Sequence, residues 1–202
     1  MSKLLVDALR HTSASSDAVT LDSSGNITVE GNLTVDGTST LTGAVSGDNG
    51  GLFSAWAQVY DLAQSTGQDG GSFTSGAWRT RTLQTEEDPS NIVSLSSNQF
   101  TLGAGTYIIR WSAPAYKVSQ HTTQLYDVTN SAVIEYGSQA YTYYDTNNAG
   151  DRSFGLARHT ITGNTAFEIQ HQCGWTANTH GFGTGQGGKL YKFTVVEILK
   201  EA

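Results

Sequence analysis

The chain has 202 residues, enough for one large β-domain with an appendage or for two small domains. Only 14% of the residues are charged and 37% are hydrophobic, while Gly occurs 23 times. This composition is typical of a β-protein with many turns, because Gly and β-branched Thr both weaken helices. The net charge of −7 argues against nucleic acid as a direct ligand, since phosphate binding needs a basic face.

The sequence also argues against a membrane protein and against a disulfide framework. No apolar run approaches the ~20 residues that a membrane-spanning helix needs. The 11 Lys and Arg residues form no cluster that would bind a membrane surface. Asp7 interrupts the first apolar segment where a secretory signal would continue, and Cys173 is the single cysteine. We therefore expect a protein that is made in the cytosol and is stable without disulfides.

The first segment, residues 1–24, combines a short apolar cluster with a run rich in hydroxyl side chains. The apolar cluster consists of Leu4, Leu5, Val6 and Leu9, and the hydroxyl-rich run covers residues 12–17. Such a segment suits a short helix or an extended strap. We favour the strap, an anchor peptide that becomes ordered on a partner.

A six-residue period begins at Gly25 and continues through residues 25–30, 31–36 and 37–42, each of which opens with Gly. Strands this short cannot bury an apolar face alone, so the repeat needs a neighbour to stack on. We expect residues 25–50 to form a β-stem in which three chains wrap around one axis. Its inward residues would be Ile27, Val29, Leu33, Val35 and Leu41. The alternative is a pair of β-hairpins that packs on the head of the same chain.

Residues 51–202 contain strand-like segments at regular spacing, separated by turn residues such as those at 102–105 and 127–131. No window of useful length shows a helical period of 3.6 residues. The sequence predicts an all-β, antiparallel jelly-roll or β-sandwich head. The expected strands cover residues 54–62, 76–81, 92–94, 99–102, 105–116, 122–127, 133–139, 152–161, 165–175 and 189–199.

Some predicted strands carry apolar residues on both faces. In residues 107–111, Tyr107 and Trp111 share one face, yet Ile108 occupies the other. In residues 190–199 both faces also carry apolar side chains. A strand that is buried on both sides of a sandwich needs a second contact surface. Burial in an oligomer is a sufficient explanation.

Two groups of residues suggest metal chemistry. His171 and Cys173 lie on one face of a predicted strand, but zinc needs about four ligands and no matching pair exists, so we expect a core His beside a buried thiol. A second group offers oxygen ligands that suit calcium, although it lacks the twelfth-position Glu of an EF-hand loop. This group comprises Asp145, Asn147, Asn148 and Asp151.

Catalytic motifs are missing from the sequence. There is no Gly-x-Ser-x-Gly elbow, no phosphate-binding loop and no His-Glu-x-x-His. Residues Glu86, Glu87 and Asp88, which precede Pro89, predict a solvated turn. We expect a protein that is not an enzyme and has no catalytic residue, no metal and no cofactor.

Aromatic and amide side chains are concentrated in two segments, residues 141–151 and 174–181. Exposed aromatic rings stack on sugar faces, and amides and carboxylates bond to hydroxyls. The sequence predicts a contact with a glycan through Tyr141, Tyr143, Tyr144, Asn147, Asn148 and Trp175. The alternative is that Tyr141 and Tyr143 continue an alternating strand.

Several motifs together resemble phage-encoded relatives of the complement globular-head and tumour-necrosis-factor-like jelly rolls. They lie at residues 100–116, 121–129, 167–173, 181–183 and 195–198. Residues 21–29 resemble the opening of many phage virion proteins. The resemblance covers most of the chain.

The resemblance implies a ten-strand jelly roll that forms a tight homotrimer on the surface of a virion. It implies either a capsid decoration (cement) protein or the tip of a short tail fibre or tailspike. A stem of about 25 residues reaches at most ~85 Å when fully extended, which is short for a fibre. We therefore favour a decoration protein that binds the major capsid protein through Leu4, Leu5, Val6 and Leu9. The alternative is a receptor-binding short tail fibre that recognises a host surface glycan.

Overall fold

The computed structural model describes residues 8–9, 19–24, 26–30, 52–143, 150–185 and 187–202. All regular elements in these ranges are β-strands, and none of these ranges contains a helix that is long and apolar enough to cross a membrane. The chain divides into two compact units, residues 1–47 and 48–202.

The first unit contains a three-stranded antiparallel sheet of β1 (Ala8–Leu9), β2 (Val19–Leu21) and β3 (Ile27–Val29). The Asp22 carboxylate closes the β2–β3 turn, because its Oδ1 accepts hydrogen bonds from the backbone N–H groups of Ser24 and Asn26. The β2–β3 pairing therefore crosses residue 24, where the sequence predicted a boundary between anchor and stem.

Only part of the predicted anchor and stem is described. Leu9 lies on β1 and is 52% exposed, and Ile27 lies on β3 and is 65% exposed. Val29, the next residue on the same side of β3, is half-buried. The other predicted anchor and stem residues lie outside the described residues: Leu4, Leu5, Val6, Leu33, Val35 and Leu41.

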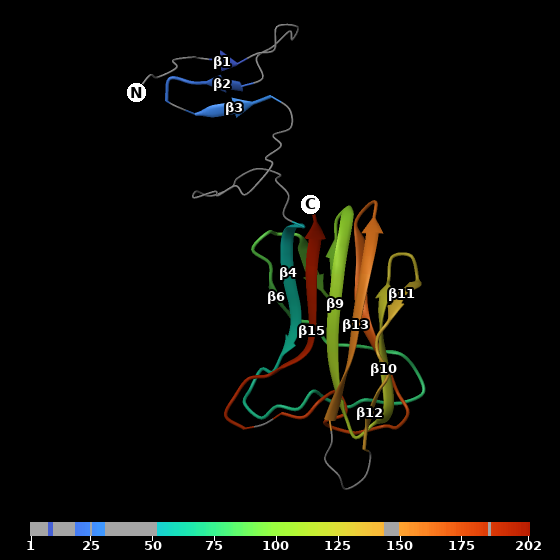
Figure 1. The fold of residues 1–202 in the computed structure, drawn as a ribbon. Coiled ribbons are helices and arrows are strands. Elements are labelled where there is room, and N and C mark those ends of the chain that lie inside the picture. Colours follow the sequence, from blue (N-terminus) through green and yellow to red (C-terminus); the bar gives the residue numbers. More distant parts are fainter. Residues whose placement is uncertain (1–7, 10–18, 25, 31–51, 144–149, 186) are drawn as a thin grey trace. The chain divides into compact units, whose positions relative to one another are not determined.

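The second unit is a head made of two facing antiparallel sheets (Figure 1). The five-stranded sheet has the order β13 (Gly150–Ile161), β9 (Gly105–Tyr116), β15 (Lys192–Glu201), β4 (Phe53–Leu62) and β6 (Thr85–Glu87). The seven-stranded sheet follows the path β11 (Ala132–Tyr136), β10 (Ser119–Asp127), β14 (Thr165–Cys173), β8 (Gln99–Leu102) and β7 (Val93–Ser96). Two further strands join it, because β12 (Ala140–Thr142) pairs with β10 and β5 (Arg79–Thr80) pairs with β14.

The strand order identifies the head as a jelly roll. The first and last long strands, β4 and β15, lie side by side, and β9 pairs with both β15 and β13. In the opposite sheet, β14 lies between β10 and β8. The chain alternates between the two sheets from β4 to β7, from β8 to β10 and from β12 to β15, a path that fits the two Greek keys of a jelly roll. The start of β4 and the C-terminus lie at one end of the head, and β12 and the start of β13 lie toward the other (Figure 1).

Alternation along the long strands builds the core. Tyr107, Ile109 and Trp111 point inward from β9 and are at most 3% exposed. Phe167 on β14 stacks on Phe100 on β8 with ring centroids 5.7 Å apart. Burial of each such side chain contributes about 1.5–3 kcal/mol. A smaller apolar cluster lies elsewhere in the head and contains Phe73, Ala115, Val118, Cys173, Ala177 and the partly buried Phe182.

The predicted strands of the head are present, with two additions. β12 was not predicted, and the Glu86–Glu87 segment was wrongly interpreted as a solvated turn. Glu86 and Glu87 lie on β6, which pairs with β4 at the edge of the five-stranded sheet. Exposed carboxylates suit this position, because charged side chains on an edge strand discourage pairing with another chain.

Gly155 on β13 leaves the space that Trp111 fills. A Cβ at Gly155 would lie 1.9 Å from Trp111 Cζ2, and the indole Nε1 donates a hydrogen bond to Thr123 Oγ1 at 2.7 Å. We predict that Gly155→Ala lowers the free energy of unfolding by about 2 kcal/mol, because the indole must leave its site. Urea unfolding measures this loss. Gly163→Ala is the matched control, since no atom lies within 4 Å of the added carbon; equal losses in both variants would contradict the packing argument.

Candidate functional site

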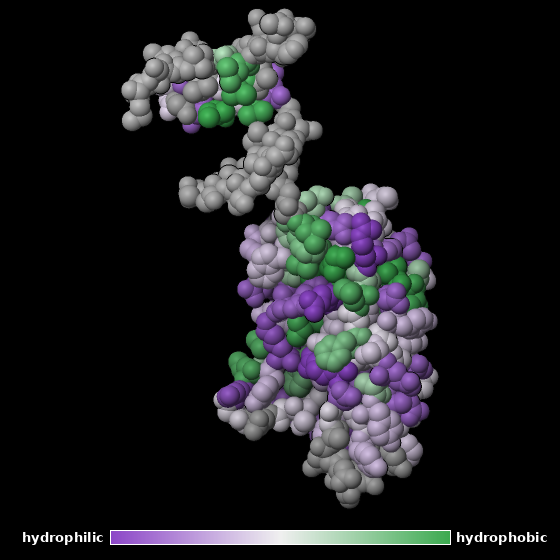
Figure 2. Space-filling model, viewed as in Figure 1, coloured by the Kyte–Doolittle hydropathy of each residue, from purple (hydrophilic) through white to green (hydrophobic). Residues whose placement is uncertain are grey.

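The outward face of the five-stranded sheet carries exposed and half-buried apolar side chains, with polar and charged side chains among them. The strand registers align them in three rows that cross β13, β9, β15 and β4. The rows are Phe154–Ser112–Val195–Tyr60, Leu156–Arg110–Glu197–Gln58 and Arg158–Ile108–Leu199–Trp56. We call these twelve residues the apolar sheet face. Figure 2 shows the apolar and charged side chains interspersed on this side of the head.

Three large residues of the apolar sheet face are unusually exposed: Leu156 by 58%, Phe154 by 56% and Trp56 by 43%. Single exposed apolar residues are common, but a contiguous apolar patch on a folded domain usually marks an interaction site. Phe154 and Leu156 lie on β13, the edge strand, and Trp56 lies on β4 across the sheet. The patch therefore spans most of the sheet width.

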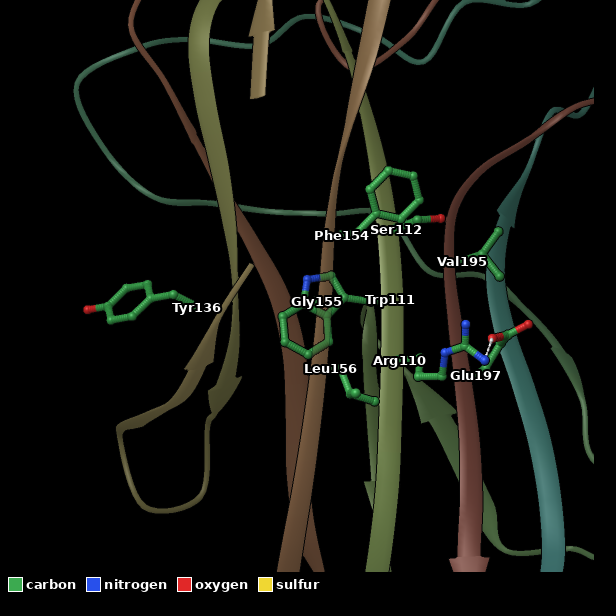
Figure 3. A pocket seen from close by; sticks show the side chains of 9 residues that line it. All are labelled: Arg110, Trp111, Ser112, Tyr136, Phe154, Gly155, Leu156, Val195 and Glu197. Atoms are coloured by element: carbon green, nitrogen blue, oxygen red, sulfur yellow. Dashed lines mark ion pairs between the residues drawn. The ribbon is translucent and has the colours of Figure 1, made fainter. Parts of the chain in front are cut away.

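A hollow of about 560 Å³ lies in the apolar sheet face. Phe154 and Leu156 line one side of it, Val195 lines the other, and Gly155 and Trp111 also contribute to its lining (Figure 3). Tyr136 belongs to the lining residues as well, although its side chain points away from the others in Figure 3. The hollow is shallow and mostly apolar, so it suits contact with another protein surface.

Arg110 and Glu197 form an ion pair in the middle row of the apolar sheet face. Arg110 Nη1 lies 3.8 Å from Glu197 Oε2, and the two side chains are 62% and 49% exposed. An exposed pair of this kind contributes little to the stability of a single chain. Glu197 is the single carboxylate among the residues that line the hollow. With its charge paired to Arg110, this face supports recognition better than acid–base catalysis.

Inside the head, Arg81 is a buried cation without a carboxylate contact in the described part of the chain. Its Nε donates to Thr194 Oγ1 at 2.7 Å, its Nη2 donates to the carbonyl of Phe182 at 2.9 Å, and its Nη1 donates to the carbonyl of Pro114 at 3.3 Å. The guanidinium also lies 4.1 Å from the Phe182 ring centroid. Burial lowers the pKa of Arg81 to about 9, and the charge of Asp61 acts in the opposite direction.

A pair of buried histidines, His121 and His171, lies in the same part of the head. His121 Nδ1 lies 2.9 Å from His171 Nε2, and the exposed fractions are 2% and 0%. Burial lowers the pKa of His121 to about 4 and that of His171 well below its usual range, and the charge of Arg81 acts in the same direction. Both rings are therefore neutral at pH 7.

The prediction of a core His beside a buried thiol is confirmed. His171 and Cys173 are both buried, and burial raises the pKa of the Cys173 thiol to about 11. Among the residues that the structure describes, no group of three or more His, Cys, Asp or Glu side chains could hold a metal ion. Of the proposed calcium ligands, Asp145, Asn147 and Asn148 lie outside the described residues, and Asp151 lies on β13.

The histidine pair makes stability dependent on pH. Because the pKa values of the folded protein lie below those of the unfolded chain, the unfolded chain binds protons first as the pH falls below about 6.5. Proton binding to His121 in the unfolded chain should therefore lower the free energy of unfolding by about 2 kcal/mol when the pH falls from 7 to 5.

Urea unfolding of wild type and His121→Gln at both pH values measures this dependence. The variant should lose less stability on acidification than wild type. His180→Gln, a change in a loop, is the control and should retain the wild-type dependence. An identical loss in wild type and His121→Gln would contradict the assignment.

The described members of the predicted glycan-contact set lie on β12 or near the start of β10, because Tyr141 pairs with Gln120 and the Trp175 N–H donates to the carbonyl of Val118. Tyr141, Tyr143 and Trp175 are 51%, 47% and 56% exposed. The Tyr141 and Tyr143 rings meet edge to face, with centroids 6.0 Å apart. Tyr141 lies on β12, so the alternative of a continuing strand holds for this residue. The remaining three, Tyr144, Asn147 and Asn148, lie outside the described residues.

The sequence analysis did not identify Phe154 and Leu156, which are the two most exposed large apolar residues of the apolar sheet face. The signal was available in the strand at 152–161, where both residues share a face with Arg158 while Ala157 and Ile161 occupy the other. The same two-sided pattern did indicate a second contact surface for residues 107–111 and 190–199. The outward apolar residues of these segments, Ile108, Val195 and Leu199, are half-buried and lie on the five-stranded sheet.

Neither a protein-family model nor a curated relative matches the sequence. Three solved structures are similar to it at a TM-score of 0.46. The globular domain of zebrafish complement 1qA protein is 13% identical, over 71% of this chain and 94% of that one. Murine APRIL at pH 8.0 is 6% identical, over 72% and 98%, and Eiger TNF from S. frugiperda is 9% identical, over 73% and 92%. The jelly-roll assignment itself rests on the strand order of the head.

Proposed function

We propose that this chain is the subunit of a homotrimeric, non-enzymatic protein on the surface of a virion, where it decorates and stabilises the capsid. The observation that carries the proposal is the apolar sheet face. It leaves Phe154, Leu156 and Trp56 in water on a chain whose core is otherwise complete. When a second copy of the same chain covers the face, these apolar side chains leave water, which lowers the free energy.

The location of the apolar residues favours a closed ring over a pairwise contact. Phe154 and Leu156 lie on the edge strand β13, whereas Trp56 and Tyr60 lie on β4 near the other edge. The edge of one chain can therefore pack on the broad face of the next, which is a head-to-tail contact. Such contacts form a ring when the rotation from one copy to the next closes after a whole number of copies, and we propose closure after three. Three copies would also give the short predicted strands of the hexad repeat, residues 25–42, the neighbours that they need to stack on.

Attachment to the capsid is assigned to the first unit. Its small sheet leaves Leu9, a predicted anchor residue, 52% exposed, and three short strands bury little apolar surface by themselves. A partner surface on the major capsid protein would cover them. Three such anchors on one trimer convert weak contacts into strong attachment. Because the protein would bind the assembled capsid alone, it would shift the equilibrium toward that state.

A receptor-binding short tail fibre is the second candidate function. The observation that favours it is the exposure of Tyr141, Tyr143 and Trp175, of which Tyr141 lies on β12, toward the end of the head away from the C-terminus (Figure 1). In this alternative, the trimer and the virion surface stay the same, but the far end of the head contacts a host glycan.

The trimer is tested by substitution in the apolar sheet face. We predict that wild type elutes with the mass of three 21.5 kDa chains in light scattering. The double variant Phe154→Asp and Leu156→Asp should elute as a monomer, because two charges would be buried without partners. Val133→Asp, on an exposed strand of the other sheet, is the control and should remain trimeric. A monomeric wild type would refute the proposal.

The capsid role is tested by sedimentation. Full-length trimer and a version that lacks residues 1–20 are each mixed with undecorated capsids and pelleted. We expect the full-length protein to pellet with capsids and the truncated protein to stay in solution. If the full-length trimer also stays in solution but binds host cells, the decoration role is wrong and the tail-fibre alternative replaces it.

A further inference from the structure

A second hollow, of about 320 Å³, lies on the outward face of the seven-stranded sheet. It is on the opposite side of the sandwich from the apolar sheet face. Its outward-pointing lining comes from three neighbouring segments, and we call it the amide hollow. The outward-pointing residues are Gln120, Thr122, Gln139, Gln172 and Gly174, and His121 and Cys173 also contribute to the lining.

The strand registers explain why these polar residues meet. Thr122 on β10 is the partner of Gln172 on β14, and Gln120 is the partner of Tyr141 on β12. His121 and Thr123, which alternate with them along β10, are buried in the interior. One face of β10 therefore belongs to the core while the other presents amides and a hydroxyl to the solvent.

The amide groups in this hollow are available for a ligand. The side chains of Gln139 and Gln172 have no hydrogen-bond partner among the residues that the structure describes. Gln120 uses its Oε1 to accept from Ser119 Oγ at 2.6 Å, which leaves its NH₂ group available. Thr122 Oγ1 donates to the carbonyl of Gly137 at 3.1 Å and can still accept. The hollow thus offers both donors and acceptors.

Aromatic rings stand beside these amides. Tyr141 lies next to Gln120 in the sheet, is 51% exposed and is supported from one edge by Tyr143. On the β14 side, Trp78 directly precedes Arg79, the register partner of His171. Trp78 is half-buried, and its ring centroid lies 6.3 Å from that of Tyr136. Flat rings next to neutral amides are suited to a ligand with an apolar face and polar edges.

The lining of the amide hollow is electrically neutral at pH 7. Its outward side chains are amides, a hydroxyl and a glycine. Burial lowers the pKa of His121 to about 4 and raises that of Cys173 to about 11, so neither is charged. A site without charge gives little affinity for a phosphate, a carboxylate or a cation. The chemistry therefore selects a neutral ligand that has many hydroxyl groups.

We propose that the amide hollow binds a neutral carbohydrate, whose hydroxyls bond to Gln120, Gln139 and Gln172 and whose ring face stacks on Tyr141. The volume is at the lower end of small-molecule sites and fits one or two sugar units. Gly174 leaves room for the Gln120 side chain, because a Cβ at residue 174 would lie 2.8 Å from Gln120 Cδ. The site does not depend on the trimer or on a virion, because it lies away from the apolar sheet face.

The test is an NMR titration of the full-length protein with lactose, maltose and N,N′-diacetylchitobiose, and with sialyllactose as the anionic comparison. We expect at least one neutral sugar to shift the side-chain NH₂ signals of Gln120, Gln139 and Gln172 in a saturable way, with a Kd of about 1 mM. Gln139→Leu, Gln172→Leu and Tyr141→Ala should each weaken binding about tenfold. Gln84→Leu, an exposed glutamine outside the hollow, is the control.

The spectra of the variants show directly whether each remains folded. Gly174→Ala provides an independent check, because it crowds Gln120 without removing an amide and should also weaken binding. Absence of saturable shifts with all three neutral sugars would overturn the proposal. So would stronger binding of sialyllactose, unchanged affinity in both glutamine variants, or shifts confined to Tyr143 and Trp175.

Discussion

The jelly-roll head depends on one buried guanidinium that joins segments from both sheets. The backbone N–H of Arg81 donates to the carbonyl of Ile169 on β14, while its side chain bonds to Thr194 on β15 and to the carbonyls of Pro114 and Phe182. A cation without a carboxylate contact is costly to bury, so all of these acceptors must be held in position. Arg81 and Phe182 lie outside the strands, so these hydrogen bonds fix the segments that contain them to the sandwich.

This internal organisation leaves two outer faces that differ in chemistry. On the five-stranded sheet, rows of apolar residues surround the Arg110–Glu197 pair, and removal of this face from water is favourable. On the seven-stranded sheet, the outward residues that line the amide hollow are amides, a hydroxyl and a glycine, which stay hydrated. One face therefore suits self-association while the other remains available to a soluble ligand. The two roles do not compete for the same surface.

Local pattern predicted most of the head, and long-range contacts account for what it missed. The bounds of β8 and β9 follow directly from alternation and flanking turn residues. β6 and β12 are three residues long and acquire strand geometry from their neighbours, so no period marks them. Burial of Arg81 could not be predicted, because arginine is normally exposed and its partners lie 33, 101 and 113 residues away. The His121–His171 contact and the amide hollow likewise arise from register between strands.

The central claim is that the apolar sheet face is covered by other copies of this chain. A crystal structure of the purified full-length protein tests it most directly, because it shows what lies against β13, β9, β15 and β4. We predict three chains around one axis, with Phe154 and Leu156 of each chain buried against its neighbour. A structure in which these two side chains face solvent, or contact nothing beyond a lattice neighbour, would contradict it.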